Sequence, residues 1–323
     1  MLRILEITFP FFALVLCGYA IARRGWLPLD SIPGLNLFVL YFALPCMLFR
    51  FGAVTPITRM LDPSIFGTYL VCALVMVSLS VATARMGGTG WNDASFGALV
   101  AAFPNSGFMG VPLLVGLLGE RAAAPAIVAL AVDMVITSSL CIALSRRGTG
   151  QAQGSGQAVL SALKGMSTNP LPWSIGLGGL VSAFGVNVPS VLMTPVAMLA
   201  DAASPVALFA LGAVLARSRM RTAAAVAAAV EPRRNDIPQI VFYKLIVHPA
   251  LVLGTGRLAI AMGAPLDSFA ATVLALVAAL PSASNVPMLA ERFGADAGRI
   301  ARIVLVSTAL AFLSFSAAVA LLV

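Results

Sequence analysis

The sequence has very little charge. Only 10% of its 323 residues are charged, whereas 60% are hydrophobic and the mean hydropathy is +1.00. A soluble domain carries roughly 25% charged residues, so this composition excludes an ordinary soluble protein. At about 20 residues per crossing, the chain has room for about ten membrane spans. We therefore predict an all-α integral membrane protein.

Side chains that carry enzyme chemistry are also scarce. The sequence has one histidine, His248, and one acidic residue well inside an apolar segment, Asp133. Its four cysteines fall in apolar segments, without the spacing of a metal site or a disulfide framework. It contains no phosphate-binding loop of the ATPase type. An enzyme, a bound metal, another cofactor and an ATP-driven pump are therefore not expected.

Basic residues outnumber acidic ones, giving a net charge of +8, but they are not interleaved with aromatic residues as in a nucleic-acid site. They instead mark one side of the membrane. The loops that follow odd-numbered spans hold 15 of the 20 basic residues, with Lys244 and Arg302 counted just inside the same face. Because basic residues favour the cytoplasmic side, both termini are predicted outside a plasma (inner) membrane and the central linker inside.

The apolar segments divide the chain into two halves of five spans. The predicted spans cover about 2–22, 35–51, 64–84, 94–118, 123–144, 171–184, a seventh ending at 216, 240–262, 266–290 and 300–323. Residues 148–168 are rich in glycine, glutamine and serine and form the predicted linker between repeats 1–147 and 169–323. A basic loop at 217–239 follows the seventh span, with an alanine run that is a candidate interfacial helix.

Two spans contain breaks that a regular helix does not tolerate. The fourth carries Pro104, Gly110 and Pro112, and the ninth carries Pro281 and Pro287. Each proline removes a backbone donor and clashes with the preceding turn, and such breaks persist at membrane depth only inside protein or beside a wet cavity. Interrupted helices at matching positions of two halves point to a transporter's binding site.

The two halves resemble each other in sequence. At a shift of 160 positions, the run Ala43, Pro45, Phe49, Gly52, Ala53 and Val54 meets Ala203, Pro205, Phe209, Gly212, Ala213 and Val214. Thr8, Pro10, Gly18 and Gly25 likewise meet Thr168, Pro170, Gly178 and Gly185. Because each half has an odd number of spans, the two repeats must have opposite orientations. This is the inverted-repeat plan of secondary transporters.

Three motifs resemble the auxin efflux carrier family over essentially the whole chain. They are L-x-L-F-x-x-Y-x-x-L-P-x-x-L-F from Leu35 to Phe49, F-P-N-S-G-F-M-G-V-P-L in the fourth span and L-P-S-A-S-N-V-P in the ninth. The family's bacterial branch includes malonate or other organic-anion transporters, and its plant branch includes auxin exporters. The resemblance implies helices 4 and 9 that cross as in bile-acid symporters and sodium/proton antiporters. The central loop here is short, so the plant substrate is not carried over.

The crossing would suit a small carboxylate such as malonate or an auxin-like acid. A half-helix that restarts after a break presents free N–H groups and a positive dipole end, which is a natural anion site. The predicted substrate-binding residues are Asn105, Ser106, Gly107, Ser282, Ser284 and Asn285. The alternative is that the breaks are only structural kinks, in which the asparagines and serines cap freed backbone groups.

Asp133 and His248 are candidates for coupling transport to protons. A lone carboxylate at membrane depth is costly, so Asp133 either carries a proton or is a protonated group hydrogen-bonded to a neighbouring helix. His248 precedes Pro249, and we favour a role in capping freed carbonyls over one as a proton relay. Arg50 either reaches the outer surface or attracts substrate.

The sequence therefore predicts a secondary carrier of small organic anions that works by alternating access at the crossing of helices 4 and 9. A sodium-coupled symporter of the bile-acid type is the alternative. A channel is disfavoured because the repeat lies within one chain. The expected partners are the anion and the lipid bilayer, with a second copy of the chain in a homodimer as a further candidate.

Overall fold

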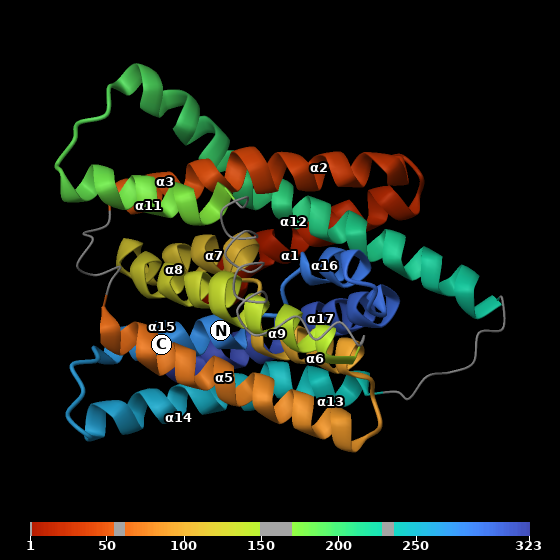
Figure 1. Ribbon diagram of the computed structural model, residues 1–323. Helices are drawn as coiled ribbons and strands as arrows, with labels where there is room; N and C mark the ends of the chain where they lie inside the picture. Colours follow the sequence, from red (N-terminus) through yellow and green to blue (C-terminus); the bar gives the residue numbers. More distant parts are fainter. Residues whose placement is uncertain (1, 55–61, 149–169, 228–235) are drawn as a thin grey trace.

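The computed structural model describes residues 2–54, 62–148, 170–227 and 236–323 (Figure 1). Within these ranges the secondary structure is helical, apart from one isolated β-bridge between Pro104 and Ser282. The predicted linker lies outside the described residues except for Gly148. An all-α protein is therefore confirmed.

The helices follow the predicted spans closely. Their bounds are α1 Leu2–Arg23, α2 Ile32–Phe38, η2 Val39–Ala43, α3 Leu44–Val54, α5 Pro63–Met86, α6 Trp91–Ala102, η3 Ser106–Gly110, α7 Val111–Leu118, α8 Ala123–Val132, η5 Asp133–Thr137, α9 Ser138–Ser145, α11 Pro170–Ala183, α12 Ser190–Ala227, α13 Ile237–Phe242, η7 Tyr243–Val247, α14 His248–Ala261, α15 Ser268–Ala279, α16 Val286–Arg292 and α17 Ala297–Leu322. The elements η2, η3, η5 and η7 are single π-helical turns.

Six helical segments of the described chain are long and apolar enough to cross a membrane. They are Leu29–Val54, Pro63–Met86, Glu120–Ser145, Ser190–Arg217, Ile237–Ala261 and Ala297–Leu322. Four shorter apolar helices accompany them: Ala13–Arg23, Ser106–Leu118, Trp173–Ala183 and Ser268–Ala279. The chain is thus a multi-pass membrane protein. Ten crossings stay a prediction, because the sixth span and the two interrupted spans consist of helices of 14 residues or fewer, although α1 has 22.

Helix α12 differs from the sequence expectation. The sequence predicts a seventh span that ends at Ala216, but one helix of 38 residues runs from Ser190 to Ala227 with Pro195 and Pro205 inside it. Neighbouring helices can compensate the backbone groups that a proline frees in a membrane. The alanine-rich stretch after Ala216 has high helix propensity, so it extends this helix. The last two residues of the predicted alanine run, 228 and 229, lie outside the described residues.

Helices α1, α2, α3, α11 and α12 lie together on one side of the molecule, and α5, α13 and α14 on the opposite side (Figure 1). Glycines allow two close helix pairs on the first side. A Cβ built on Gly18 of α1 would stand 2.0 Å from the Phe209 carbonyl oxygen of α12. One built on Gly178 of α11 would stand 2.4 Å from the Phe49 carbonyl oxygen of α3. Small residues let membrane helices approach closely in this way.

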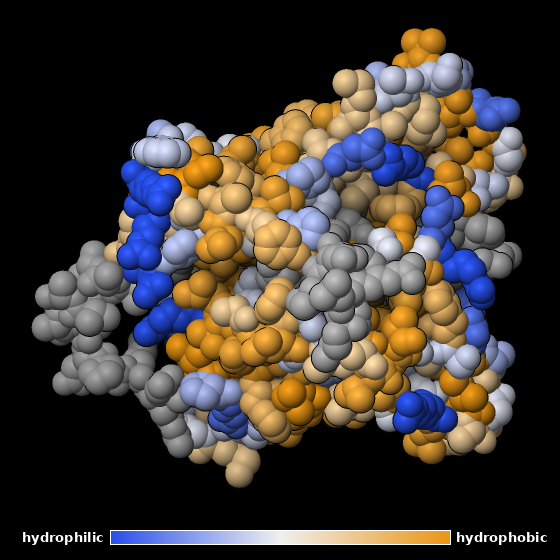
Figure 2. Space-filling model, turned by 180° about the vertical axis from the view of Figure 1, so that it is seen from behind, coloured by the Kyte–Doolittle hydropathy of each residue, from blue (hydrophilic) through white to orange (hydrophobic). Residues whose placement is uncertain are grey.

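Helices α6 and α15 form the centre of the fold. Every residue from Ala94 to Ala102 is buried, as is nearly all of α15. Around this centre the surface is apolar. Figure 2 shows hydrophobic side chains across the middle of one face and hydrophilic ones gathered toward the two edges. This distribution fits a protein whose middle lies in lipid and whose ends lie in water.

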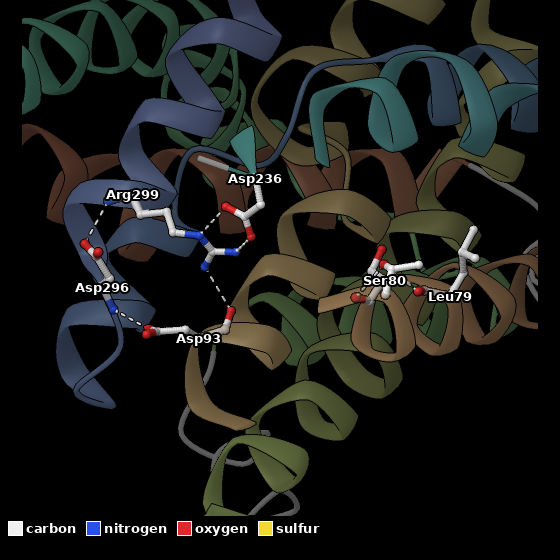
Figure 3. Close-up of polar contacts among 7 residues, drawn as sticks. Leu79, Ser80, Asp93, Asp236, Asp296 and Arg299 are labelled. Carbon is white, nitrogen blue, oxygen red and sulfur yellow. Dashed lines mark hydrogen bonds and ion pairs between the residues drawn. The ribbon is translucent and has the colours of Figure 1, made fainter. Parts of the chain in front are cut away.

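A buried arginine ties three helix ends together (Figure 3). Arg299 at the start of α17 forms a two-pronged ion pair with Asp236, just before α13, through Nε and Nη2. Its Nη1 also donates to the backbone carbonyl of Asp93 in α6 at 3.0 Å. Asp296 caps α17 through the Arg299 backbone N–H, and its own N–H donates to the Asp93 carboxylate at 2.8 Å. The starts of α6, α13 and α17 are therefore held as one unit.

Candidate functional site

The two predicted helix breaks lie against each other. Helix α6 ends at Ala102 and α15 ends at Ala279, and the extended segments that follow them pair. The Asn105 N–H donates to the Pro281 carbonyl at 2.8 Å, and the Ala283 N–H donates to the Phe103 carbonyl at 3.0 Å. These two bonds flank the antiparallel bridge and satisfy backbone groups that the breaks expose.

The position of the prolines explains where the helices stop. Pro104 and Pro281 lack the N–H that would continue each helix, and the residue before a proline is driven from helical to extended geometry. Helix α16 starts at Val286, with Pro287 in its first turn, where a proline is well tolerated. In the fourth span the chain becomes helical again at Ser106, in the π-helical turn η3. The α-helix α7 begins five residues later, at Val111, and has Pro112 in its first turn.

Gly110 connects the two breaks sterically. It lies at the end of η3, so it is part of a helical turn, where we had expected a break. A Cβ at this position would stand 2.5 Å from Cδ1 of Leu280. Any larger residue at this position would therefore force the side chain of Leu280, the first residue of the second break, to shift away from η3.

Two of the predicted substrate-binding serines are engaged inside the protein. The Ser282 hydroxyl donates to the Val100 carbonyl at 2.7 Å, and the Ser282 N–H donates to the Ser307 hydroxyl at 3.2 Å. The Ser106 hydroxyl donates to the Pro104 carbonyl at 3.2 Å. Both side chains are buried and cap backbone carbonyls freed by the breaks. For these two serines the structure therefore agrees with the alternative in which the polar residues cap the backbone of structural kinks.

The other predicted polar residues are differently placed. Asn105 is only 2% exposed, and its side-chain Nδ2 has no hydrogen-bond partner in the described structure. Gly107 is buried in η3. Ser284 and Asn285 are partly exposed and line a small cavity. Asn105 thus leaves a buried donor unused, which is unusual for a group with only a structural role.

The cavity lies between the breaks and the side of the fold that carries α2 and α12. Its lining residues are Asn36, Val39, Leu40, Phe108, Ala207, Leu211, Val214, Ser284 and Asn285. Its free volume is about 10 Å³, which is about the least that holds one water molecule. A carboxylate with a carbon chain does not fit within this volume.

A second polar cluster lies in helices α5, η5 and η7. The Tyr69 hydroxyl donates to Oδ2 of Asp133 at 2.7 Å, and the Thr137 hydroxyl donates to Oδ1 at 3.1 Å. The side chain of Asp133 is completely buried. The predicted hydrogen bond from a neighbouring helix is therefore present, and Asp133 is the acceptor in it.

Lys244 and His248 complete this cluster. Lys244 Nζ lies 3.1 Å from His248 Nδ1 and donates to the Ala278 carbonyl of α15 at 2.8 Å. The rings of His248 and Tyr69 are 6.1 Å apart between centroids. We had counted Lys244 with one membrane face and expected His248 to cap carbonyls. Instead both are fully buried, and it is the lysine that caps a carbonyl.

Sequence reasoning missed Tyr69 and Lys244 as members of this cluster. A signal was present for the lysine, because it lies four residues before His248 in an apolar segment and so on the same helix face. No comparable pattern marks Tyr69, whose pairing with Asp133 depends on tertiary packing.

Arg50 is ion-paired. Its Nη1 lies 2.7 Å from Oδ1 of Asp201 in α12, and its guanidinium is 5.9 Å from the centre of the Phe51 ring. The pair joins α3 to α12 on the side of the molecule opposite α5. Among the described residues, no group of three or more histidine, cysteine, aspartate or glutamate side chains could hold a metal ion.

Comparison with known proteins finds membrane transporters. The family model described as "Membrane transport protein" matches residues 3–319. A protein of Rhizobium meliloti (strain 1021) named "Putative malonate transporter" is 28% identical over 316 residues, covering 96% of this chain and 93% of that one. The "Uncharacterized transporter YfdV" of Escherichia coli (strain K12) is 28% identical over 296 residues, covering 88% and 86%.

Proposed function

This chain belongs to the membrane transport protein family, and from that premise we propose that it is a secondary carrier of a small organic anion in the plasma membrane. The family is one of transporters and not of enzymes. The name of the Rhizobium relative adds malonate as the first carboxylate to test.

One observation carries the proposal. The two helix breaks meet, and Ser284 and Asn285 next to them border a cavity whose other wall is α2 and α12. Helix α16 begins at Val286, directly after Asn285, and a helix N-terminus favours an anion. Asn285 supplies a neutral hydrogen-bond donor without a buried charge. Asn105 supplies a second one, because its side-chain Nδ2 has no partner in the described structure.

We further propose that the molecule is a five-plus-five inverted repeat of ten helices, divided at 148–168. The close contact of Gly18 with Phe209 and that of Gly178 with Phe49 support this plan, because a shift of 160 residues turns one contact into the other. Each joins a helix of one half to a helix of the other, as a two-fold axis between repeats requires.

Alternating access would then be a movement between two groups of helices. One group is α1, α2, α3, α11 and α12, and the other contains the breaks. The cavity between them is too small for a carboxylate, so in this proposal the two groups part to admit one. Both termini would lie outside, as the distribution of basic residues predicts.

Flux into proteoliposomes tests the proposal. The purified protein is assayed with labelled malonate and a panel of other mono- and dicarboxylates, with and without pH and sodium gradients. We expect uptake of at least one carboxylate without sodium. Strict sodium dependence would favour the bile-acid type of symport, and no flux of any organic anion would refute the proposed substrate class.

A further inference from the structure

The cluster of Tyr69, Asp133, Lys244 and His248 places an acidic and a basic side chain in the middle of the protein. All four side chains are 0% exposed. Asp133 and Lys244 make no direct ion pair in the described structure, but Tyr69, which donates to Asp133, lies with its ring 6.1 Å from that of His248, the neighbour of Lys244. With the carboxylate ionised and the ammonium protonated, the cluster is neutral. One further proton would leave one positive charge in a low-dielectric interior, which is costly without a negative partner.

The hydrogen bonds show where such a proton fits. A carboxylate only accepts, and both oxygens of Asp133 now accept from hydroxyls. The Thr137 hydroxyl can rotate and accept instead, so Oδ1 can carry a proton while Tyr69 still donates to Oδ2. The cluster is also incompletely satisfied, because His248 Nε2 has no partner in the described structure. In a purely structural network, each buried donor and acceptor is expected to have a hydrogen-bond partner.

Lys244 connects this cluster to the helix break. Its ammonium donates to the carbonyl of Ala278, in the last turn of α15. The break that begins at Leu280 follows at once and leads to Ser284 and Asn285 at the cavity. While Asp133 is ionised, its charge offsets that of Lys244. When Asp133 is neutral, Lys244 loses this counter-charge, and an anion bound beside the break would replace it.

We propose that Tyr69, Asp133, Lys244 and His248 form a proton-binding site, in which Asp133 takes up one proton as the organic anion binds beside the helix breaks. Lys244 is the positioning residue that links the two events, and His248 orients it. By reciprocity the proton strengthens anion binding as much as the anion strengthens proton binding. The inference rests on the proposed function, because the step that it couples is anion transport.

Other titratable groups on the packed elements lie outside this cluster. Cys72 of α5 and Cys141 of α9 are buried near it, and Tyr243 bonds to Gln239 on the partly exposed face of α13 and η7. The remaining groups stand near element ends: Arg85 on α5, Asp93 on α6, Asp236 before α13, Arg257 on α14, Asp267 before α15, and Arg299 and Arg302 on α17. Asp236 and Arg299 neutralise each other. Among the described residues Asp133 is thus the only fully buried carboxylate, since Asp201 inside α12 is exposed and paired with Arg50.

Infrared difference spectroscopy tests the site without any substrate. In the purified protein, a carboxylic-acid C=O band should appear and disappear with pH, and Asp133→Asn should abolish it. Lys244→Met should shift the pH midpoint of this band, which a merely structural lysine would not do. Tyr243→Phe, next to Lys244 in the same turn, is the control and should leave the midpoint unchanged.

Proteoliposomes that enclose a pH-sensitive dye test the coupling. With malonate outside, we expect one proton to enter with each anion in the wild type, and anion entry without protons in Asp133→Asn. A titrating band that survives in Asp133→Asn, or anion flux without protons in the wild type, would overturn the inference. If no carboxylate moves at all, the proposed function fails, while the infrared result still decides whether the proton site exists.

Discussion

At the scale of single residues, Ser282 and Ser284 are expected to have different roles, the first in stability and the second in anion binding. The buried Ser282 hydroxyl caps the Val100 carbonyl, whereas Ser284 lines the cavity. Ser282→Ala should lower the free energy of unfolding by about 1–3 kcal/mol, because a buried acceptor loses its donor. Ser284→Ala should leave stability within about 0.5 kcal/mol and weaken anion uptake. Thermal unfolding in detergent and flux, measured on both variants, check this pair, and equal losses of stability would contradict it.

Asn285 is the residue for which we expect the largest effect on binding. A lost hydrogen bond to a charged ligand costs about 1.5–3 kcal/mol, so Asn285→Ala should raise the apparent KM for malonate about 10- to 100-fold. Asn105→Ala should also slow transport, since its unpaired amide lies in the first break.

The exposed Asn187 in the loop before α12 provides a control for both asparagines. Asn187→Ala should transport as the wild type does. Unchanged KM values in Asn105→Ala and Asn285→Ala would mean that the breaks are structural kinks only.

At the scale of helices, close packing of α11 on α3 depends on Gly178. A Cβ there would overlap the Phe49 carbonyl of α3, whereas one on Gly176 in the same helix meets nothing within 4 Å. We expect Gly178→Ala to destabilise the protein by about 1–3 kcal/mol, as overpacking does. Gly176→Ala should be neutral or slightly stabilising, since alanine favours helix. A comparison of the two melting temperatures is the measurement, and identical values would show that the helices can separate at no cost.

Much of this helical arrangement could be predicted from the sequence. The breaks could be located because Pro104, Pro281 and Pro287 act locally on the backbone. The extent of α12 could not, because tertiary packing decides whether Pro195 and Pro205 end a helix. The π-helical turns η2, η3, η5 and η7 have no sequence pattern of their own. The pairing of Asp133 with Tyr69, and that of Lys244 with Ala278, depend on how α5, η5, η7 and α15 pack, which periodicity does not reveal.

At the scale of the whole molecule, the inverted repeat makes a prediction about topology. Cysteines introduced at Glu120, in the exposed loop after α7, and at Gly154, in the predicted linker, should lie on opposite sides of the membrane. A membrane-impermeant maleimide added to intact cells should label the first and spare the second. Labelling of both from outside would contradict the orientation drawn from the basic residues.

The central claim is that one organic anion at a time crosses where the two breaks meet, while α2 and α12 part from them. Counterflow tests it most directly. Proteoliposomes are loaded with unlabelled malonate and diluted into a trace of labelled malonate, with no ion gradient and no membrane potential. An alternating-access carrier must accumulate label transiently above its outside concentration, and Asn285→Ala should reduce this overshoot. Label that rises only to equilibrium would indicate a channel, and label that does not enter would contradict transport of this anion altogether.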